Sequence, residues 1–198
     1  MNDRNGWLAL IEENPGHSQW YIDRFRKLAD EGTDLHGEAR LVDAMVGRGA
    51  RILDAGCGPG RVGGYLARAG HDVTGVDLDP LLIAAARVDH PGPRWLVGDL
   101  AELDLPGAGF DVIVCGGNVM TFLAPDTRRP VLGRMKDHLR DGGRAVIGFG
   151  TGRGYEVDDF VADAGSAGLA PDLMLATWDL RPYRDGADFL VAVLAPES

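Results

Sequence analysis

The stretch Arg51-Ile-Leu-Asp-Ala-Gly-Cys-Gly-Pro-Gly60 decides the fold of this 198-residue chain. An apolar run ends here in an aspartate and three glycines at alternate positions, and residues 61–69 then have a helical pattern. A strand that turns directly into a helix through glycines is typical of α/β sheets, where ligands bind beyond the carboxyl ends of strands. Without a Cβ, Gly56 can make the sharp reversal, Gly58 permits close approach of ligand atoms, and Gly60 allows tight helix packing.

Further short apolar runs follow this turn, separated by helical stretches. They are near-continuously apolar, as expected for parallel strands buried on both faces. The expected strands span residues 51–55, 72–76, 94–97, 110–114 and 144–149. The expected helices span residues 61–69, 80–89, 126–139 and 158–168. Asp79 should cap the second of these ahead of Pro80, and the alternation predicts a parallel sheet with right-handed crossovers.

The two ends of the chain differ from this middle part. Residues 1–48 form a helical section, because apolar residues recur there at helical spacing. In the tail, strand-like runs at 173–180 and 188–194 are joined by turn residues at 181–186, which predicts a closing antiparallel hairpin. Since no repeat, low-complexity tract or linker interrupts the chain, residues 1–198 are expected to form a single domain, with a core at 49–198.

Composition narrows the class of protein. The net charge is −10 and no Lys/Arg cluster is present, so nucleic acid is not expected as a partner. No apolar run approaches the ~20 residues needed to cross a bilayer, and residues 1–6 lack the features of a secretory leader. We therefore expect a soluble, cytoplasmic protein with no membrane partner. The two cysteines form no Cys/His metal pattern, so no metal is expected.

The glycine spacing excludes two common nucleotide sites. A dinucleotide fingerprint would need glycine at position 61, which is Arg61, and the Gly-Lys-Ser/Thr ending of a phosphate-binding loop is absent. Asp77 lies about twenty residues after the loop, where an acidic residue can accept hydrogen bonds from ribose hydroxyls. Asp99, after the third strand, could accept from an adenine amino group, with Leu78 and Leu100 flanking the ring. Each aspartate could equally cap a helix or turn.

Together with Phe110–Val114 and Leu139–Gly143, these motifs resemble those of class I S-adenosylmethionine (SAM)-dependent methyltransferases, over about residues 36–195. The resemblance implies an α/β, doubly wound, Rossmann-like seven-stranded sheet of order 3-2-1-4-5-7-6, with an antiparallel C-terminal hairpin and an N-terminal helical lid at 1–48. It also implies SAM as cofactor and S-adenosylhomocysteine (SAH) as product. The implied cofactor-binding residues are Asp54, Ala55, Gly56, Cys57, Gly58, Gly60, Asp77, Leu78, Asp99, Leu100, Cys115 and Gly116.

The same resemblance implies a role for several of these residues. Asp77 would hold the ribose and Asp99 the adenine amine, while Gly56 and Gly58 would lie under the methionine part. Asp54 would organise the loop near the methionine ammonium group. The backbone carbonyls of Cys115 and Gly116 would accept hydrogen bonds from that ammonium.

Methyl transfer from SAM needs no protein nucleophile, because the sulfonium is already an activated leaving group and positioning does most of the work. A general base is needed only if the acceptor carries its proton at neutral pH, so no catalytic residue is assigned. The candidate substrate-pocket residues are His17, Trp20, Tyr21, Asn118 and Thr121. The alternatives are that Trp20 is core, that His17 is an exposed loop residue, and that Asn118 is an N-cap.

We therefore expect in-line methyl transfer to a small-molecule acceptor that the sequence does not identify. The alternatives are a non-catalytic SAM-binding or partner subunit and, less favoured because of Arg61, a nicotinamide-dependent oxidoreductase. Arg40 either meets the SAM carboxylate or makes a surface ion pair. Cys57 and Cys115 end neighbouring strands, so a reversible oxidation between them is a further hypothesis.

Overall fold

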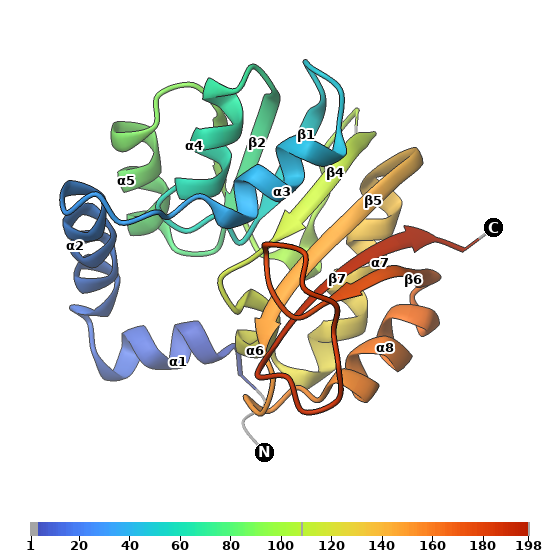
Figure 1. Ribbon diagram of the computed structural model, residues 1–198. Helices are drawn as coiled ribbons and strands as arrows, with labels where there is room; N and C mark the ends of the chain where they lie inside the picture. The colour runs from blue at the N-terminus through green and yellow to red at the C-terminus, as the bar shows by residue number, and fades with distance from the viewer. Residues whose placement is uncertain (1–3, 108, 198) are drawn as a thin grey trace.

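A computed structural model describes residues 4–107 and 109–197 as a seven-stranded sheet flanked by helices (Figure 1). The strand order is β3-β2-β1-β4-β5-β7-β6, which confirms the predicted topology. The pairs formed among β1 to β5 are all parallel, and β7 is antiparallel to both of its neighbours, β5 and β6. The strands are β1 (Arg51–Ala55), β2 (Asp72–Asp77), β3 (Arg94–Val97), β4 (Phe110–Cys115), β5 (Leu139–Gly150), β6 (Leu169–Leu175) and β7 (Phe189–Pro196).

The helices follow the predicted pattern closely. They are α1 (Gly6–Glu13), α2 (His17–Asp30), α3 (Gly37–Met45), α4 (Arg61–Arg68), α5 (Pro80–Asp89), α6 (Val119–Phe122), α7 (Arg128–His138) and α8 (Val157–Ser166), with short 3₁₀ turns η1 (Leu100–Glu102) and η2 (Pro125–Thr127). The predicted cap of α5 is confirmed, because the Asp79 carboxylate accepts a hydrogen bond from the backbone N–H of Leu81 at 2.8 Å. None of the helices in the described ranges has the length and apolar character needed to span a membrane.

Successive strand residues point to opposite faces, and this divides the core in two. Ile52 of β1 packs in a cluster with residues of α3 and α4. The next residue, Leu53, belongs to a larger cluster that includes residues of α7 and α8. The near-continuous apolar strands therefore have both faces covered, as their sequences predict.

The predicted boundaries of β5 and β6 are wrong. β5 begins at Leu139, because Leu139 pairs with Phe110 ahead of a register shift, so the segment expected to end a helix belongs to the strand. β6 begins at Leu169 and includes Pro171, which an edge strand tolerates. Residues 176–188, partly assigned to that strand, instead connect β6 to β7.

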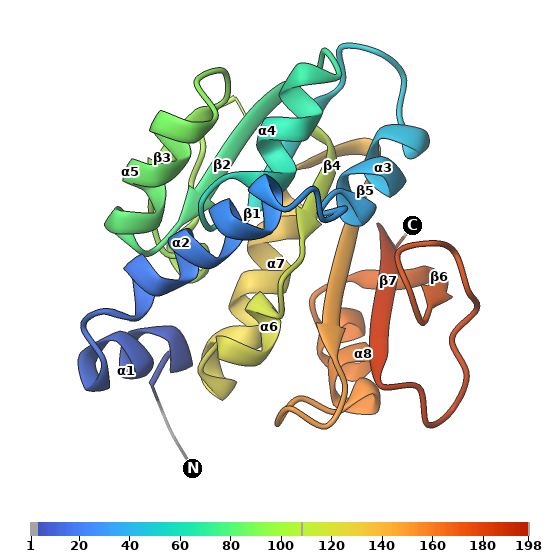
Figure 2. The ribbon, with the colours of Figure 1, turned by 60° about the vertical axis from the view of Figure 1, so that its left-hand side comes forward.

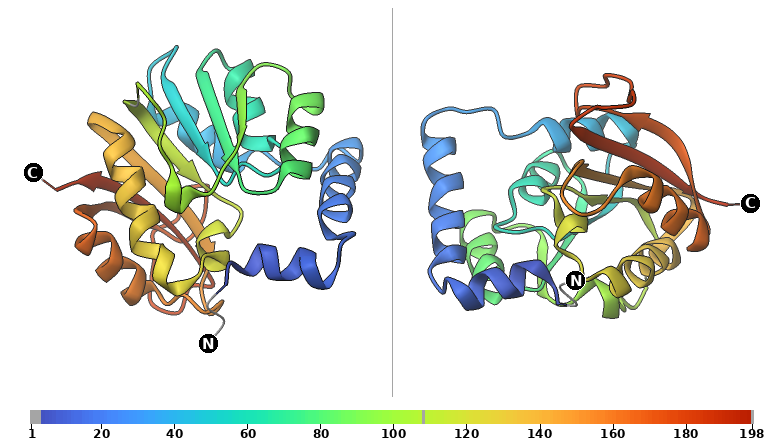
Figure 3. Two further views of the ribbon diagram at one scale, coloured as in Figure 1. Left: turned by 180° about the vertical axis from the view of Figure 1, so that it is seen from behind. Right: turned by 90° about the horizontal axis from the view of Figure 1, so that it is seen from below.

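The expected N-terminal helical section is present within the described residues. α2 contacts α5, and α1 contacts α6. Figures 2 and 3 show both helices on the side of the sheet where the parallel strands end. Residues 1–3, part of the segment expected to lack a secretory leader, lie outside the described residues.

Candidate active site

A cavity of about 850 Å³ opens beyond the carboxyl ends of the parallel strands. The glycine loop lines it on the strand side, while α1, α2, α3, α6 and the β6–β7 connection contribute to the other walls. Its volume lies within the roughly 300–1,000 Å³ of small-molecule sites. The fold therefore forms a ligand-sized cavity where the sequence expects one.

Most residues singled out from the sequence line this cavity. They are His17, Trp20, Tyr21, Asp54, Gly56, Cys57, Gly58, Asp77, Leu78, Asp99, Leu100, Gly116 and Asn118. The structure does not bring four others to the cavity wall, namely Ala55, Gly60, Cys115 and Thr121.

These four residues make contacts within the protein instead. Ala55 and Cys115 are fully buried in the main core cluster. A Cβ on Gly60 would lie 2.9 Å from the Cβ of Ala86, so its missing side chain permits helix packing, as predicted. The Thr121 hydroxyl donates a hydrogen bond to the backbone carbonyl of residue 118 at 2.8 Å.

Two glycines of the loop are required for different reasons. Gly56 has φ of +75°, and a Cβ there would lie 2.4 Å from Cγ2 of Val119, so glycine lets α6 pack against the loop. Gly58 has φ of +53°, and the nearest atom to its notional Cβ is Cε1 of Tyr21 at 3.8 Å. A ligand can therefore approach the backbone of Gly58 closely.

The Asp77 carboxylate is buried and held in place by the backbone. It accepts hydrogen bonds from the N–H groups of Gly58 at 2.8 Å and Asp79 at 2.9 Å. Burial raises the pKa of Asp77 above its usual range. Each oxygen of an ionised carboxylate has a second lone pair, so Asp77 can bind ribose hydroxyls while it organises the loop.

Asp99 combines the two alternatives left open by the sequence. It caps η1, because its Oδ1 accepts a hydrogen bond from the N–H of Ala101 at 2.9 Å. It is also exposed and lines the cavity, as do Leu78 and Leu100. The cap leaves Oδ2 of Asp99 free of hydrogen bonds to the described residues and able to meet an adenine amino group.

Asp54 lies beneath the glycine loop and is almost completely buried. Its Oδ2 accepts a hydrogen bond from the backbone N–H of Gly63 at 2.8 Å, which connects β1 to α4. Burial raises the pKa of Asp54 to about 7. This carboxyl group therefore changes charge near neutral pH, at the edge of the cavity.

Cys57 and Cys115 are both buried free thiols. Cys57 packs with Trp95 and Ile83, whereas Cys115 lies in the main core cluster. Burial raises the pKa of both thiols. Because the thiolate is the reactive form, this environment argues against the oxidation hypothesis.

The lid helices are attached through Asp79, which the sequence identified only as an N-cap. Its Oδ2 accepts hydrogen bonds from Nε1 of Trp7 at 2.9 Å and from Oγ of Ser18 at 2.5 Å. These donors lie on α1 and α2, and the acceptor precedes α5. One buried carboxylate thus holds both helices against the core.

Aromatic side chains form the part of the cavity under the lid. The Trp7 ring makes edge contacts with His17, Tyr21 and Phe122 at centroid distances of 5.2, 5.3 and 5.8 Å. Trp20 is 54% exposed and lines the cavity, so its interpretation as core is wrong. His17 is the first residue of α2 and not a loop residue.

Asn118 has a different role from an N-cap. It precedes α6 with φ of +67°, but its side chain makes no cap hydrogen bond. Its Oδ1 instead accepts a hydrogen bond from the N–H of Gly150 at 2.7 Å, which joins the ends of β4 and β5. Asn118 therefore shapes the cavity wall between two strands.

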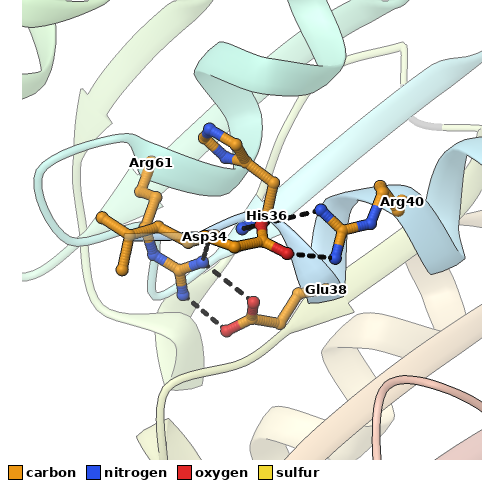
Figure 4. Close-up of polar contacts among 6 residues, drawn as sticks. Asp34, His36, Glu38, Arg40 and Arg61 are labelled. Carbon is orange, nitrogen blue, oxygen red and sulfur yellow. Dashed lines mark hydrogen bonds and ion pairs between the residues drawn. The ribbon is translucent and has the colours of Figure 1, made fainter. Parts of the chain in front are cut away.

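Two ion pairs lie near the start of α3, of which the Glu38–Arg61 pair was not predicted (Figure 4). Glu38 and Arg61 pair through both oxygens at 2.5 and 2.9 Å, with both side chains largely buried. Arg40 makes two hydrogen bonds to Asp34, each of 2.7 Å, at an exposed position. The surface ion pair is thus the alternative that the structure supports for Arg40.

Trp178 is a cavity residue that the sequence analysis missed. It lies in the β6–β7 connection, and a Cβ on Gly148 would be only 2.3 Å from its Cζ2. The signal that could have found it is the glycine at position 148, in the middle of an apolar strand.

The residues at the strand ends fit SAM by their chemistry. Asp77 and Asp99 supply acceptors for ribose and adenine, Gly58 permits close approach, and acidic side chains suit a cationic ligand. Each individual contact between these residues and SAM stays a prediction.

The comparisons with known proteins agree on one family. Residues 52–143 match the family model described as a methyltransferase domain. The sequence of a TehB-like SAM-dependent methyltransferase from Corynebacterium glutamicum is 53% identical to this chain. Its crystal structure matches the fold with a TM-score of 0.90. The similarity covers 93% of this chain and 100% of that one.

Two curated relatives are more distant. A malonyl-[acyl-carrier protein] O-methyltransferase of Pectobacterium atrosepticum is 34% identical over 69% of this chain and 50% of its own length. An uncharacterized methyltransferase of Mycobacterium bovis is 38% identical over 60% of both chains. The chain thus spans half to three-fifths of the length of these two relatives. These findings leave the nicotinamide-dependent alternative without support.

Proposed function

Because the chain belongs to the class I SAM-dependent methyltransferases, we propose that it methylates a small organic molecule bound beneath α1 and α2. The observation that carries the proposal is the extent of the cavity. It continues beyond the expected cofactor residues into a second region, lined by Trp7, His17, Trp20 and Phe122. An aromatic pocket closed by two short helices suits a compact acceptor.

We place the cofactor along the strand ends. Asp77 would accept hydrogen bonds from the ribose hydroxyls, and Asp99 would accept from the adenine amino group. Leu78 and Leu100 would flank the adenine ring. Gly116 would offer its backbone carbonyl to the ammonium group at the other end.

When bound, SAM supplies a methyl group on a sulfonium leaving group. The protein then has to hold the acceptor atom in line behind the methyl carbon, and such positioning contributes up to ~7–11 kcal/mol in favourable cases. Trp7, Tyr21 and Phe122 exclude water and form the walls that orient the acceptor. For an acceptor that carries its proton at neutral pH, His17 is the candidate general base.

The test is methyl transfer from isotopically labelled SAM into a metabolite extract, followed by ultrafiltration. Label is expected in the small-molecule fraction, and Trp20→Ala should reduce it. Val88→Ala, a truncation to alanine at a 74% exposed position of α5 away from the cavity, serves as the control. Label found only in macromolecules would contradict the proposal. An acceptor attached to an acyl-carrier protein, as named for the Pectobacterium relative, would give that result.

A further inference from the structure

The Glu38–Arg61 ion pair is a buried pair of opposite charges in the wall of the cavity. Glu38 lies in the first turn of α3, and Arg61 is the first residue of α4. The side chains are only 14% and 18% exposed. Arg61 Nη1 also donates a hydrogen bond to the backbone carbonyl of Leu35. Figure 4 shows the two charged groups facing one another.

The pair lies at the end of the cavity opposite to the expected adenine site. Cγ of Glu38 is 3.7 Å from the position that a Cβ on Gly116 would occupy, just after β4. Arg61 directly follows the glycine loop after β1. Asp77 instead ends β2 and Asp99 follows β3, and both strands lie on the other side of β1 from β4. A cofactor with adenine over β3 therefore has its amino-acid end beside this pair.

The pKa of Glu38 is shifted in the opposite direction to the pKa values of the neighbouring cavity carboxylates Asp54 and Asp77. Burial acts to raise the pKa of Glu38, but the hydrogen bonds and charge of Arg61 outweigh it, so the pKa is lowered. By contrast, burial raises the pKa of both Asp54 and Asp77. Glu38 is thus a buried carboxylate that keeps its negative charge at neutral pH.

Both partners retain hydrogen-bonding capacity. A guanidinium has five N–H groups, and Arg61 uses three of them, two for Glu38 and one for Leu35. The Glu38 oxygens have lone pairs beyond those that Arg61 occupies. An ammonium group needs such an acceptor, and a carboxylate needs such donors.

We propose that Glu38 and Arg61 together receive the zwitterionic amino-acid end of the cofactor. Glu38 accepts hydrogen bonds from the α-ammonium, and Arg61 donates its remaining N–H groups to the α-carboxylate. The inference rests on SAM as the cofactor of the proposed function, and it is independent of the methyl acceptor.

The competing explanation is that the pair only fastens α3 to α4. Buried ion pairs are often no more stabilising than apolar residues of similar volume, so stability alone does not explain the pair. A purely structural pair would affect all ligands of the cavity alike. A pair that binds the zwitterion affects the affinity only of ligands that possess an amino-acid end.

Titration calorimetry with two ligands separates these explanations. SAH has the amino-acid end, whereas 5′-methylthioadenosine retains the adenosine and thioether without it. Glu38→Gln keeps the size of the side chain and is expected to weaken SAH binding about tenfold while changing 5′-methylthioadenosine binding less than twofold. Glu31→Gln makes the same chemical change in the exposed Lys27–Glu31 pair, whose residues do not line the cavity, and it should leave both affinities unchanged.

A charge exchange gives the second readout. Glu38→Arg combined with Arg61→Glu restores an ion pair but exchanges its charges, so the melting temperature should recover while SAH stays weakly bound. Recovery of SAH affinity in this double variant would overturn the proposal. So would an equal loss of both ligands in Glu38→Gln. If the double variant does not fold, the ratio of the two affinities in Glu38→Gln decides, because 5′-methylthioadenosine binding reports an intact cavity. Failure of both ligands to bind the parent protein would instead count against the cofactor placement itself.

Discussion

Trp7 donates its indole N–H to the carboxylate of Asp79, 72 residues further along the chain, at 2.9 Å. The backbone N–H of Asp79 in turn donates to Asp77, and Asp77 accepts from Gly58 in the glycine loop. A continuous chain of hydrogen bonds therefore joins the lid to the expected cofactor site.

Replacement of Asp79 should cost more than the loss of a helix cap. Asp79→Ala removes the cap, worth about 1 kcal/mol, and leaves the donors of Trp7 and Ser18 without their acceptor, at about 1 kcal/mol each or more. We expect the free energy of unfolding to fall by about 3 kcal/mol in urea titrations. A loss no larger than that of the cap would show that the two lid contacts contribute nothing.

Asp77→Ala is expected to weaken SAM binding by roughly 10- to 100-fold, because two ribose hydroxyls lose a charged acceptor. The measurement is calorimetry with SAM and SAH. Asp72→Ala, at the exposed start of the same strand, is the matched control and should leave both affinities unchanged. Unaltered affinity in Asp77→Ala would exclude Asp77 as the ribose ligand.

Asp54 should make stability depend on pH in a defined direction. Its pKa is raised by burial from 3.8 to about 7, so its protonated form favours the folded state. Its stabilising contribution is complete below pH 3.8 and is lost as the pH rises to about 7. In Asp54→Asn the side chain at this position does not titrate. Its amide oxygen can still accept the hydrogen bond from the backbone N–H of Gly63.

The stability of Asp54→Asn relative to the parent should therefore increase by about 1.4 kcal/mol per pH unit between pH 4 and 7, and then level off. Urea titrations of both proteins across this range measure it. A difference that is independent of pH would contradict a raised pKa at Asp54.

Gly148→Ala tests the wall formed by Trp178. The added Cβ would lie 2.3 Å from the Trp178 ring, so the indole has to move, at a cost of about 1–3 kcal/mol. We expect a lower melting temperature and a raised KM for the methyl acceptor. Gly133→Ala on α7, where a Cβ meets no atom within 4 Å, should be neutral or slightly stabilising. Equal effects of the two substitutions would exclude the ring contact.

Local patterns predicted the elements of the sheet well. The apolar runs predicted the parallel strands, the family resemblance implied their order, and Asp79 ahead of Pro80 marks the start of α5. Predictions were wrong where tertiary contacts decide the boundary. Residues 176–180 have a strand-like composition, but Trp178 lies in the cavity wall against Gly148, and β6 forms further upstream.

By itself the sequence determined the family, the cofactor and the acidic residues after β2 and β3, because these features lie within single strand–turn–helix units. Only the tertiary structure decided how the lid is attached and which charges meet in the cavity. Trp7 and Asp79 are 72 residues apart, and Glu38 and Arg61 are 23 apart on different helices. No spacing rule connects such pairs, since their contact depends on the packing of whole helices against the sheet.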